Sequence, residues 1–169
     1  QAHYLDCLID AAARVPSREK SKAVQATIRG IRIRNLSPLA SNKYFDDRAW
    51  MVLALGRAGR VGRGARGTTR RLLHSLVEGI DPSTGVLPWR VGDVFFNVPS
   101  NGPAAIAFAR AGRLDEACAL VDWIFDNLVD DSGLILDGVR LSMGGMEVER
   151  GRYTYNQGVM IGACLEIAL

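Results

Sequence analysis

The sequence predicts an all-α fold, and two observations support this prediction. Apolar residues recur at helical spacing nearly throughout the 169 residues, and no segment shows the sustained alternation of apolar and polar residues that marks a strand. The expected helices also alternate between two kinds, one apolar on most of its sides and one with a single apolar stripe. Wholly buried helices that alternate with half-buried helices predict two concentric layers, as in α/α toroids and solenoids.

The first four expected helices form two such pairs. Residues 2–14 are mostly apolar, whereas 18–34 is a basic segment with a narrow apolar stripe. Residues 46–58 are apolar all round, whereas 68–80 present apolar residues on one face. The stripe residues of the two half-buried helices are Val24, Ile28 and Ile31, and Leu72, Leu73, Leu76, Val77 and Ile80.

A third pair follows the same rule, and a fourth begins. Residues 101–111 are small and apolar, 114–128 carry a broad stripe, and the apolar segment 155–169 starts the fourth pair. Two long loops, 81–100 and 129–152, are rich in glycine and turn residues and precede buried helices. Long ordered loops on a rigid scaffold commonly carry binding groups.

The composition predicts one globular domain, residues 1–169, that can bury a core, since 48% of its residues are hydrophobic. The only dense basic patch, RAGRVGRGARGTTRR, is interpreted as a solvated loop, so no nucleic-acid partner is expected at a net charge of +3. The longest apolar run, VMIGACLEIAL, is about half a membrane span, so no span is expected. The chain starts and stops inside helical patterns, which indicates truncation at both ends.

The cysteines, Cys7, Cys118 and Cys164, lie in apolar helical surroundings without the CxxC spacing of a zinc site. Their number is odd, and we expect buried free thiols. Unpaired thiols favour the cytoplasm, and export stays open as an alternative because the start of the chain looks cut.

No cofactor or metal is expected. Residues 62–67, GRGARG, match the GxGxxG spacing of dinucleotide-binding loops, but they follow an expected helix instead of a strand and lack the acidic residue downstream. His3 and His74 lie far apart in the sequence without a ligand pattern around them, so a metal site is not supported.

Polar residues coincide at the starts of the buried helices. If these helices all run in the same direction, their N-termini open on one rim, and the two long loops hang over it. Capping preferences would account for any one such residue, but four N-termini share the feature. The polar rim residues are Gln1, His3, Asp46, Asp47, Ser100, Asn101, Tyr155, Asn156 and Gln157.

Asp46 and Asp47 are the candidate catalytic residues. Side chains of adjacent helical residues point about 100° apart, so the two carboxyls can straddle a bond at roughly 5 to 6 Å, the spacing of a retaining glycosidase. The alternative is that both acids only serve the helix dipole. Aromatic rings and amides suit sugar faces and hydroxyls. Those expected near the rim are Tyr44, Phe45, Trp50, Trp89, Phe96, Tyr153, Tyr155, Asn101, Asn156 and Gln157.

Several motifs together resemble one known family, glycoside hydrolase family 76, the endo-α-1,6-mannanases. KYFDDRAW resembles its YYDD-x-x-W segment, FNVPSNGPAAIAFAR its K-N-A-x-S-N element, and YTYNQGVMIGACLE its TYNQG helix. LVDDSGLILDGV resembles the loop before that helix, and QAHYLDCLIDAAAR the helix after a WWQ-type segment. The matches fall in the family's order and span nearly the whole chain.

The resemblance implies part of an (α/α)6 barrel that cleaves α-1,6-mannosidic bonds with retention, with Asp46 as nucleophile and Asp47 as general acid/base. Phe45 stands where the family usually has a second tyrosine, and Phe96 where a lysine commonly precedes the asparagine. The expected substrate contacts, from the resemblance and from the rim pattern, are Tyr44, Trp50, Trp89, Asn97, Ser100, Asn101, Asp137, Tyr155, Asn156 and Gln157.

The expected partner is α-mannan or a mannose-containing oligosaccharide of bacterial cell-envelope type, and the rest of the barrel would come from the same longer protein. The residues alone leave alternatives open. One is another α/α-toroid sugar enzyme, such as a transglycosylase, lyase, isomerase or glucan hydrolase. The other is a non-catalytic helical-repeat scaffold that binds a protein or a glycan.

Overall fold

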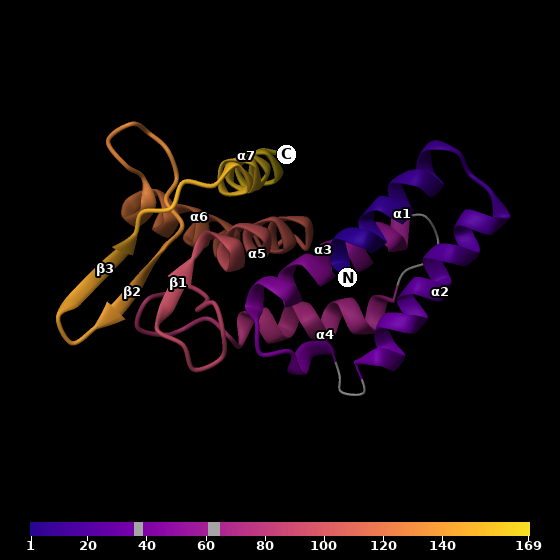
Figure 1. Ribbon diagram of the computed structural model, residues 1–169, viewed down its shortest axis with the longest axis horizontal. Helices are drawn as coiled ribbons and strands as arrows, with labels where there is room; N and C mark the ends of the chain where they lie inside the picture. The colour runs from indigo at the N-terminus through magenta and orange to yellow at the C-terminus, as the bar shows by residue number, and fades with distance from the viewer. Residues whose placement is uncertain (36–38, 61–64) are drawn as a thin grey trace.

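The computed structural model describes residues 1–35, 39–60 and 65–169, and in this part of the chain it contains seven α-helices and one small sheet (Figure 1). The helices are α1 (Ala2–Arg14), α2 (Arg18–Arg34), α3 (Phe45–Arg60), α4 (Arg66–Val77), α5 (Val98–Arg110), α6 (Leu114–Leu128) and α7 (Thr154–Ala168). The expected all-α class is confirmed. No helix in the described ranges is long and apolar enough to cross a membrane.

The helices form the two predicted layers. The inner helices contact one another in chain order, α1 on α3, α3 on α5, and α5 on α7. The outer helices cover them, with α2 packed on α1, α4 on α3 and α5, and α6 on α5 and α7. This is the alternating arrangement of an α/α toroid.

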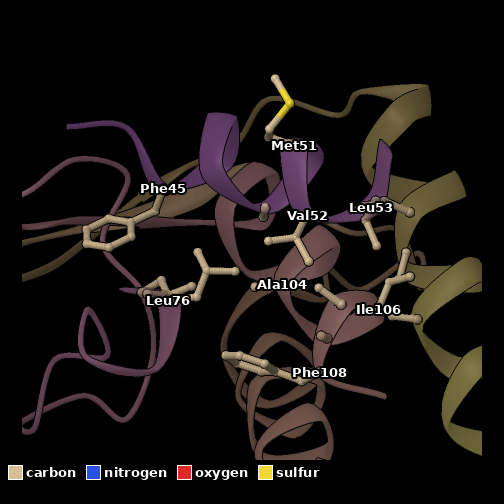
Figure 2. Packing of buried hydrophobic residues seen from close by; sticks show 14 of the residues in the cluster. Phe45, Met51, Val52, Leu53, Leu76, Ala104, Ile106 and Phe108 are labelled. Atoms are coloured by element: carbon tan, nitrogen blue, oxygen red, sulfur yellow. The ribbon is translucent and has the colours of Figure 1, made fainter. Parts of the chain in front are cut away.

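Helix α5 is the centre of the core, since its neighbours cover it on nearly every side. Its small residues let the inner helices approach closely, and a Cβ added to Gly102 would lie 2.8 Å from Val159 of α7. Figure 2 shows Val52 of α3 pointing toward α5, near Ala104. Such tight packing fixes where the first turn of each inner helix stands.

The sheet was not expected from the sequence. Strands β1 (Phe95–Asn97), β2 (Gly138–Ser142) and β3 (Gly145–Glu149) form an antiparallel sheet in the order β1-β2-β3. Each strand has at most five residues, which is too short for alternation to stand out from a loop. The sheet lies at one end of the helices and joins the two long loops that precede α5 and α7 (Figure 1).

The three cysteines are free, but the expectation that they are buried is wrong. Cys7 and Cys164 are exposed and Cys118 is half-buried. Cys7 lies on α1 and Cys164 on α7, the inner helices at the two ends of the described row, which have inner neighbours on one side only. An apolar sequence pattern therefore does not predict burial on a helix side that no neighbouring helix covers.

The β1–β2 pairing leads to a stability prediction. A Cβ on Gly138 would lie 2.6 Å from the carbonyl oxygen of Phe96, and a strand backbone cannot move aside. We expect Gly138→Ala to lower the free energy of unfolding by about 1–3 kcal/mol in urea denaturation. The control Gly30→Ala lies in α2 with open space around it, and it should raise stability by about 0.5–1 kcal/mol. Equal effects of the two changes would contradict the steric explanation.

Candidate active site

Asp46 and Asp47 lie in the first turn of α3, as predicted, and N–H donors hold Asp46 in place. The backbone N–H of Asp47 donates to Oδ1 of Asp46 at 2.8 Å. The indole Nε1 of Trp89 donates to Oδ2 of the same carboxylate at 3.3 Å. Trp89 belongs to the loop before β1, so the structure brings two segments far apart in sequence to one carboxylate.

Burial distinguishes the two acids. Asp46 is half-buried, and this burial raises its pKa above the ordinary value, helped by the negative charge of Asp47 and opposed by the hydrogen bonds from Asp47 and Trp89. Asp47 is exposed. The site therefore contains one poorly solvated carboxylate beside one that solvent and a ligand can reach.

Asn42 is a site residue that sequence analysis did not identify. Its amide Nδ2 donates to Oδ2 of Asp47 at 3.0 Å. An asparagine just before a helix looks like any other turn residue, and no sequence signal marks it as a partner of the acid. A hollow of about 270 Å³ opens here, lined by Gln1, Ala2, Asn35, Leu39, Asn42, Asp47 and Met51.

Aromatic rings stand beside Asp46. The rings of Tyr44 and Trp89 lie 5.1 Å apart between centroids, and Phe95 meets Trp89 edge-on at 6.5 Å. Backbone hydrogen bonds hold this group together, since the N–H of Phe45 donates to the Trp89 carbonyl and the N–H of Trp89 to the Phe95 carbonyl. Trp89 is still 36% exposed, which leaves ring surface for a ligand.

Asn101, on α5, binds the backbone of the loop that carries Trp89. Its Oδ1 accepts the N–H of Leu87 at 2.8 Å, and its Nδ2 donates to the Leu87 carbonyl at 2.8 Å. Asn101 and Leu87 are both fully buried. The amide therefore fixes the loop two residues before Trp89, and through it the donor to Asp46.

Gln157 makes the corresponding contact on α7. Its Oε1 accepts the N–H of Ile135 at 2.9 Å, and its Nε2 donates to the Ile135 carbonyl at 2.8 Å. This pair of bonds fixes the second long loop two residues before Asp137. Both loops are thus attached to the first turn of the inner helix that follows them.

Asp137 lies beside the first turn of α7. Asn156 Nδ2 donates to its Oδ1 at 2.9 Å, and the Tyr155 hydroxyl donates to the same atom at 3.3 Å. Burial, together with the charges of Asp137 and Asp46, raises the pKa of Tyr155 to about 12, so the phenol keeps its proton at neutral pH. The ring of Tyr155 also stacks on Tyr153 at 5.4 Å.

The predicted substrate contacts separate into two groups by burial. Asp137 and Tyr155 join Tyr44 and Trp89 as at least partly accessible groups. Trp50 is half-buried and its ring lies 4.7 Å from that of His3. Gln157 is half-buried, and its amide is engaged by Ile135. The fully or nearly buried members of the predicted set are Asn97, Ser100, Asn101 and Asn156.

These four side chains are buried, and three of them bind neighbouring parts of the chain. That they also contact the sugar directly stays a prediction. Asn97 caps α5 through a hydrogen bond from Ser100 N–H to its Oδ1. Asn101 holds Leu87, and Asn156 holds Asp137. The rim therefore contains both surface groups and buried polar groups beneath them.

Phe45 and Phe96, the two phenylalanines that differ from the family pattern, are also buried. Phe45 is packed beneath the guanidinium of Arg48, 4.5 Å from the ring centroid, and a Cβ on Gly79 would overlap its ring. Phe96 packs on Trp123. Rings without polar groups suit these enclosed positions.

No group of three or more His, Cys, Asp or Glu could hold a metal ion within the described ranges. The GxGxxG match at 62–67 lies partly outside the described residues, and its last two residues, Arg66 and Gly67, begin α4.

Helical hairpins in two layers, with adjacent carboxylates and aromatic rings at one end, define an α/α toroid with a polar rim. The family model Glycosyl hydrolase family 76 matches residues 1–168. The chain belongs to this family. Among curated proteins, none matches the chain.

Solved structures agree with the family. The GH76A α-1,6-mannanase from Salegentibacter sp. HEL1_6 is 27% identical, with a TM-score of 0.87 over 98% of this chain and 53% of that one. An inactive variant of that enzyme, with two adjacent aspartates replaced by alanine and α-1,6-mannotetrose bound, gives 26% and 0.88 over 98% and 52%. A protein from Listeria innocua gives 25% and 0.86 over 98% and 51%. The chain spans about half the length of these structures.

The raised pKa of Asp46 predicts a pH-dependent effect on stability. A carboxyl with a raised pKa in the folded state destabilises the fold once it ionises, so the penalty is absent below the unfolded pKa and complete above the folded pKa. Asp46→Asn should therefore raise the melting temperature at neutral pH. The gain should vanish as the pH falls below about 4. A variant less stable than the parent at pH 7 would contradict this assignment.

The Asn101 contact predicts a loss of both stability and ring placement. Asn101→Ala leaves the buried N–H and carbonyl of Leu87 unpaired, which costs about 1–3 kcal/mol for each group. We also expect altered tryptophan emission, because Trp89 is no longer held against Asp46. Gln157→Ala is the matched control, since it should lower stability through Ile135 without this change in emission. Identical emission in the two variants would argue against the role of Asn101 in placing Trp89.

Proposed function

We propose that the protein is a retaining endo-α-1,6-mannanase in which Asp46 is the nucleophile and Asp47 the general acid/base. The observation that carries this proposal is the adjacent acid pair, one partly buried and oriented by two N–H donors, the other exposed. Family membership supports glycoside hydrolysis. The relatives named α-1,6-mannanases include variants inactivated at two adjacent aspartates that hold α-1,6-linked mannose oligomers.

The roles follow from the surroundings of each acid. Both oxygens of Asp46 face N–H groups that do not give up a proton, so its orientation is fixed, and poor solvation makes a carboxylate a stronger nucleophile. Asp47 is exposed and can exchange its proton with a leaving group and with water. An exposed acid beside a fixed nucleophile suits the double-displacement mechanism.

In the first step, a carboxylate oxygen of Asp46 bonds to C1 of the mannose as the C1–O glycosidic bond breaks. The proton of Asp47 passes to the departing glycosidic oxygen, so the leaving sugar departs as an alcohol. The products are a mannosyl ester on Asp46 and an ionised Asp47.

In the second step, Asp47 takes a proton from water as the water oxygen bonds to C1. The ester bond to Asp46 breaks, and its electron pair returns to the carboxylate. Both acids regain their starting protonation states, and the configuration at C1 is retained. A sugar hydroxyl in place of water would give transglycosylation.

The exposed aromatic rings suit the faces of mannose units. Trp89 presents a ring beside Asp46, with Tyr44 next to it. At the start of α7, Tyr155 carries a hydroxyl that stays protonated, and Asp137 offers acceptor oxygens. Rings for the apolar faces of a sugar and polar groups for its hydroxyls are the usual components of such a cleft.

We further propose that the remaining half of the barrel comes from the same longer protein. The solved relatives are about twice as long as this chain. Helix α7 exposes apolar residues along one side, and α1 packs on the inner helix α3. The exposed apolar side chains of α7 include Ile161 and Leu165, and the exposed Leu169 directly follows the helix. The rest of the ring would cover these faces and complete the cleft.

The test is release of oligosaccharides from linear α-1,6-mannan by the full-length protein. Asp47→Asn should lower the rate by about 10²- to 10⁴-fold, because protonation of the leaving group is lost. The Asp46→Ala Asp47→Ala variant should release nothing. Asp126→Asn, on an exposed position of α6, is the matched control and should keep the parent rate.

Near-normal turnover by Asp47→Asn would overturn the assignment of Asp47. No release by the folded parent protein would reject the mannanase proposal and favour a non-catalytic scaffold. Cleavage without new reducing ends would indicate a transferase.

A further inference from the structure

Three hydrogen bonds converge on Asn42, just before α3. The guanidinium Nε of Arg48 donates to the Asn42 backbone carbonyl at 2.6 Å. The backbone N–H of Tyr44 donates to the side-chain Oδ1 of Asn42 at 3.0 Å. The side-chain Nδ2 of Asn42 donates to Oδ2 of Asp47 at 3.0 Å.

These bonds fix which way the amide of Asn42 faces. Its Oδ1 must point at the Tyr44 N–H, because an NH₂ group turned there would meet another donor. The NH₂ group is therefore the end that faces Asp47. The orientation follows from the network and needs no further assumption about the amide.

Arg48 holds Asn42 in position from inside the protein. It is only 8% exposed, its guanidinium lies 4.5 Å over the ring of Phe45, and its Nη1 donates to the Ser75 carbonyl on α4 at 3.3 Å. Asn42, which contacts Asp47, is thus connected to α4 through the buried side chain of Arg48.

We infer that Asn42 is a positioning residue that assigns the catalytic proton of Asp47 to Oδ1; the inference rests on the proposed function. Asn42 donates to Oδ2, and a protonated carboxyl oxygen is a poorer acceptor than its unprotonated partner. The proton is therefore carried by Oδ1. The amide also limits rotation of the carboxyl, so Oδ1 keeps one direction.

The consequence concerns the first step of the reaction. The Oδ1–H bond of Asp47 breaks as its proton passes to the glycosidic oxygen, and in the second step Oδ1 takes a proton from water. A sugar leaving group needs this proton, because an alkoxide departs poorly. A dinitrophenolate is stable as an anion and departs without a proton. A residue that acts by placing the proton should matter for the first kind of substrate and not for the second.

The experiment compares kcat/KM for α-1,6-mannan and for 2,4-dinitrophenyl α-1,6-mannobioside in the full-length protein. Asn42→Ala should lower kcat/KM for mannan about 10²-fold, the effect of a misplaced catalytic group. The same variant should keep nearly the parent value for the dinitrophenyl substrate. Asn127→Ala, an asparagine that bonds to the Trp123 carbonyl on α6, is the matched control and should change neither value.

A second variant guards against misfolding. Asn42→Asp keeps an oxygen that can accept the Tyr44 N–H but offers no donor to Asp47, so the same selective loss on mannan is expected. Equal losses on both substrates, or no loss on mannan, would overturn the inference. Absence of mannan cleavage by the parent protein would instead refute the proposed function, so the two failures are distinguishable.

Discussion

The site depends on holding two carboxyl groups side by side at the start of a buried helix. Neighbouring carboxylates repel, and burial makes Asp46 more costly to ionise. The structure answers with N–H donors from three places, which are the helix backbone, the indole of Trp89 and the amide of Asn42. None of these donors carries a charge. These donors therefore stabilise the pair without adding a positive charge.

Two of those donors, Trp89 and Asn42, lie in loops, and side chains of the inner helices position these loops. Asn101 on α5 fixes Leu87, which places Trp89 against Asp46. Gln157 on α7 fixes Ile135, which places Asp137 beside Tyr155. The polar residues at the helix starts thus act mainly on the polypeptide, and the groups that they position are the ones at the surface. Because α3, α5 and α7 pack tightly on one another, the loops attached to α5 and α7 keep fixed positions relative to the acids on α3.

The helices and the acid pair could be predicted from the sequence, because periodicity and a pair of acids on an apolar helix are local signals. The small sheet could not, because strands of this length alternate too briefly. The rim pattern indicated Asn101 and Asn156 but not their burial, since a residue at a helix start faces either the surface or a loop. Asn42 has no local signal at all. Its role appears only when the folded chain brings its amide to Asp47.

The attachment of loops to helix starts also determines where this fold can change length. Leu87 and Asn101 are 14 residues apart and Ile135 and Gln157 are 22 apart, and the segment between each pair can lengthen without disturbing the hydrogen bonds that join its ends. The β2–β3 turn, around Gly145 with its φ of +112°, lies inside the second of these segments. An insertion there would extend the β2–β3 hairpin beyond the rim and leave Asp46 and Asp47 in place. Among related proteins, differences in the length or branching of the bound polymer are therefore expected to go with differences in the length of this hairpin, and not with changes in the helices.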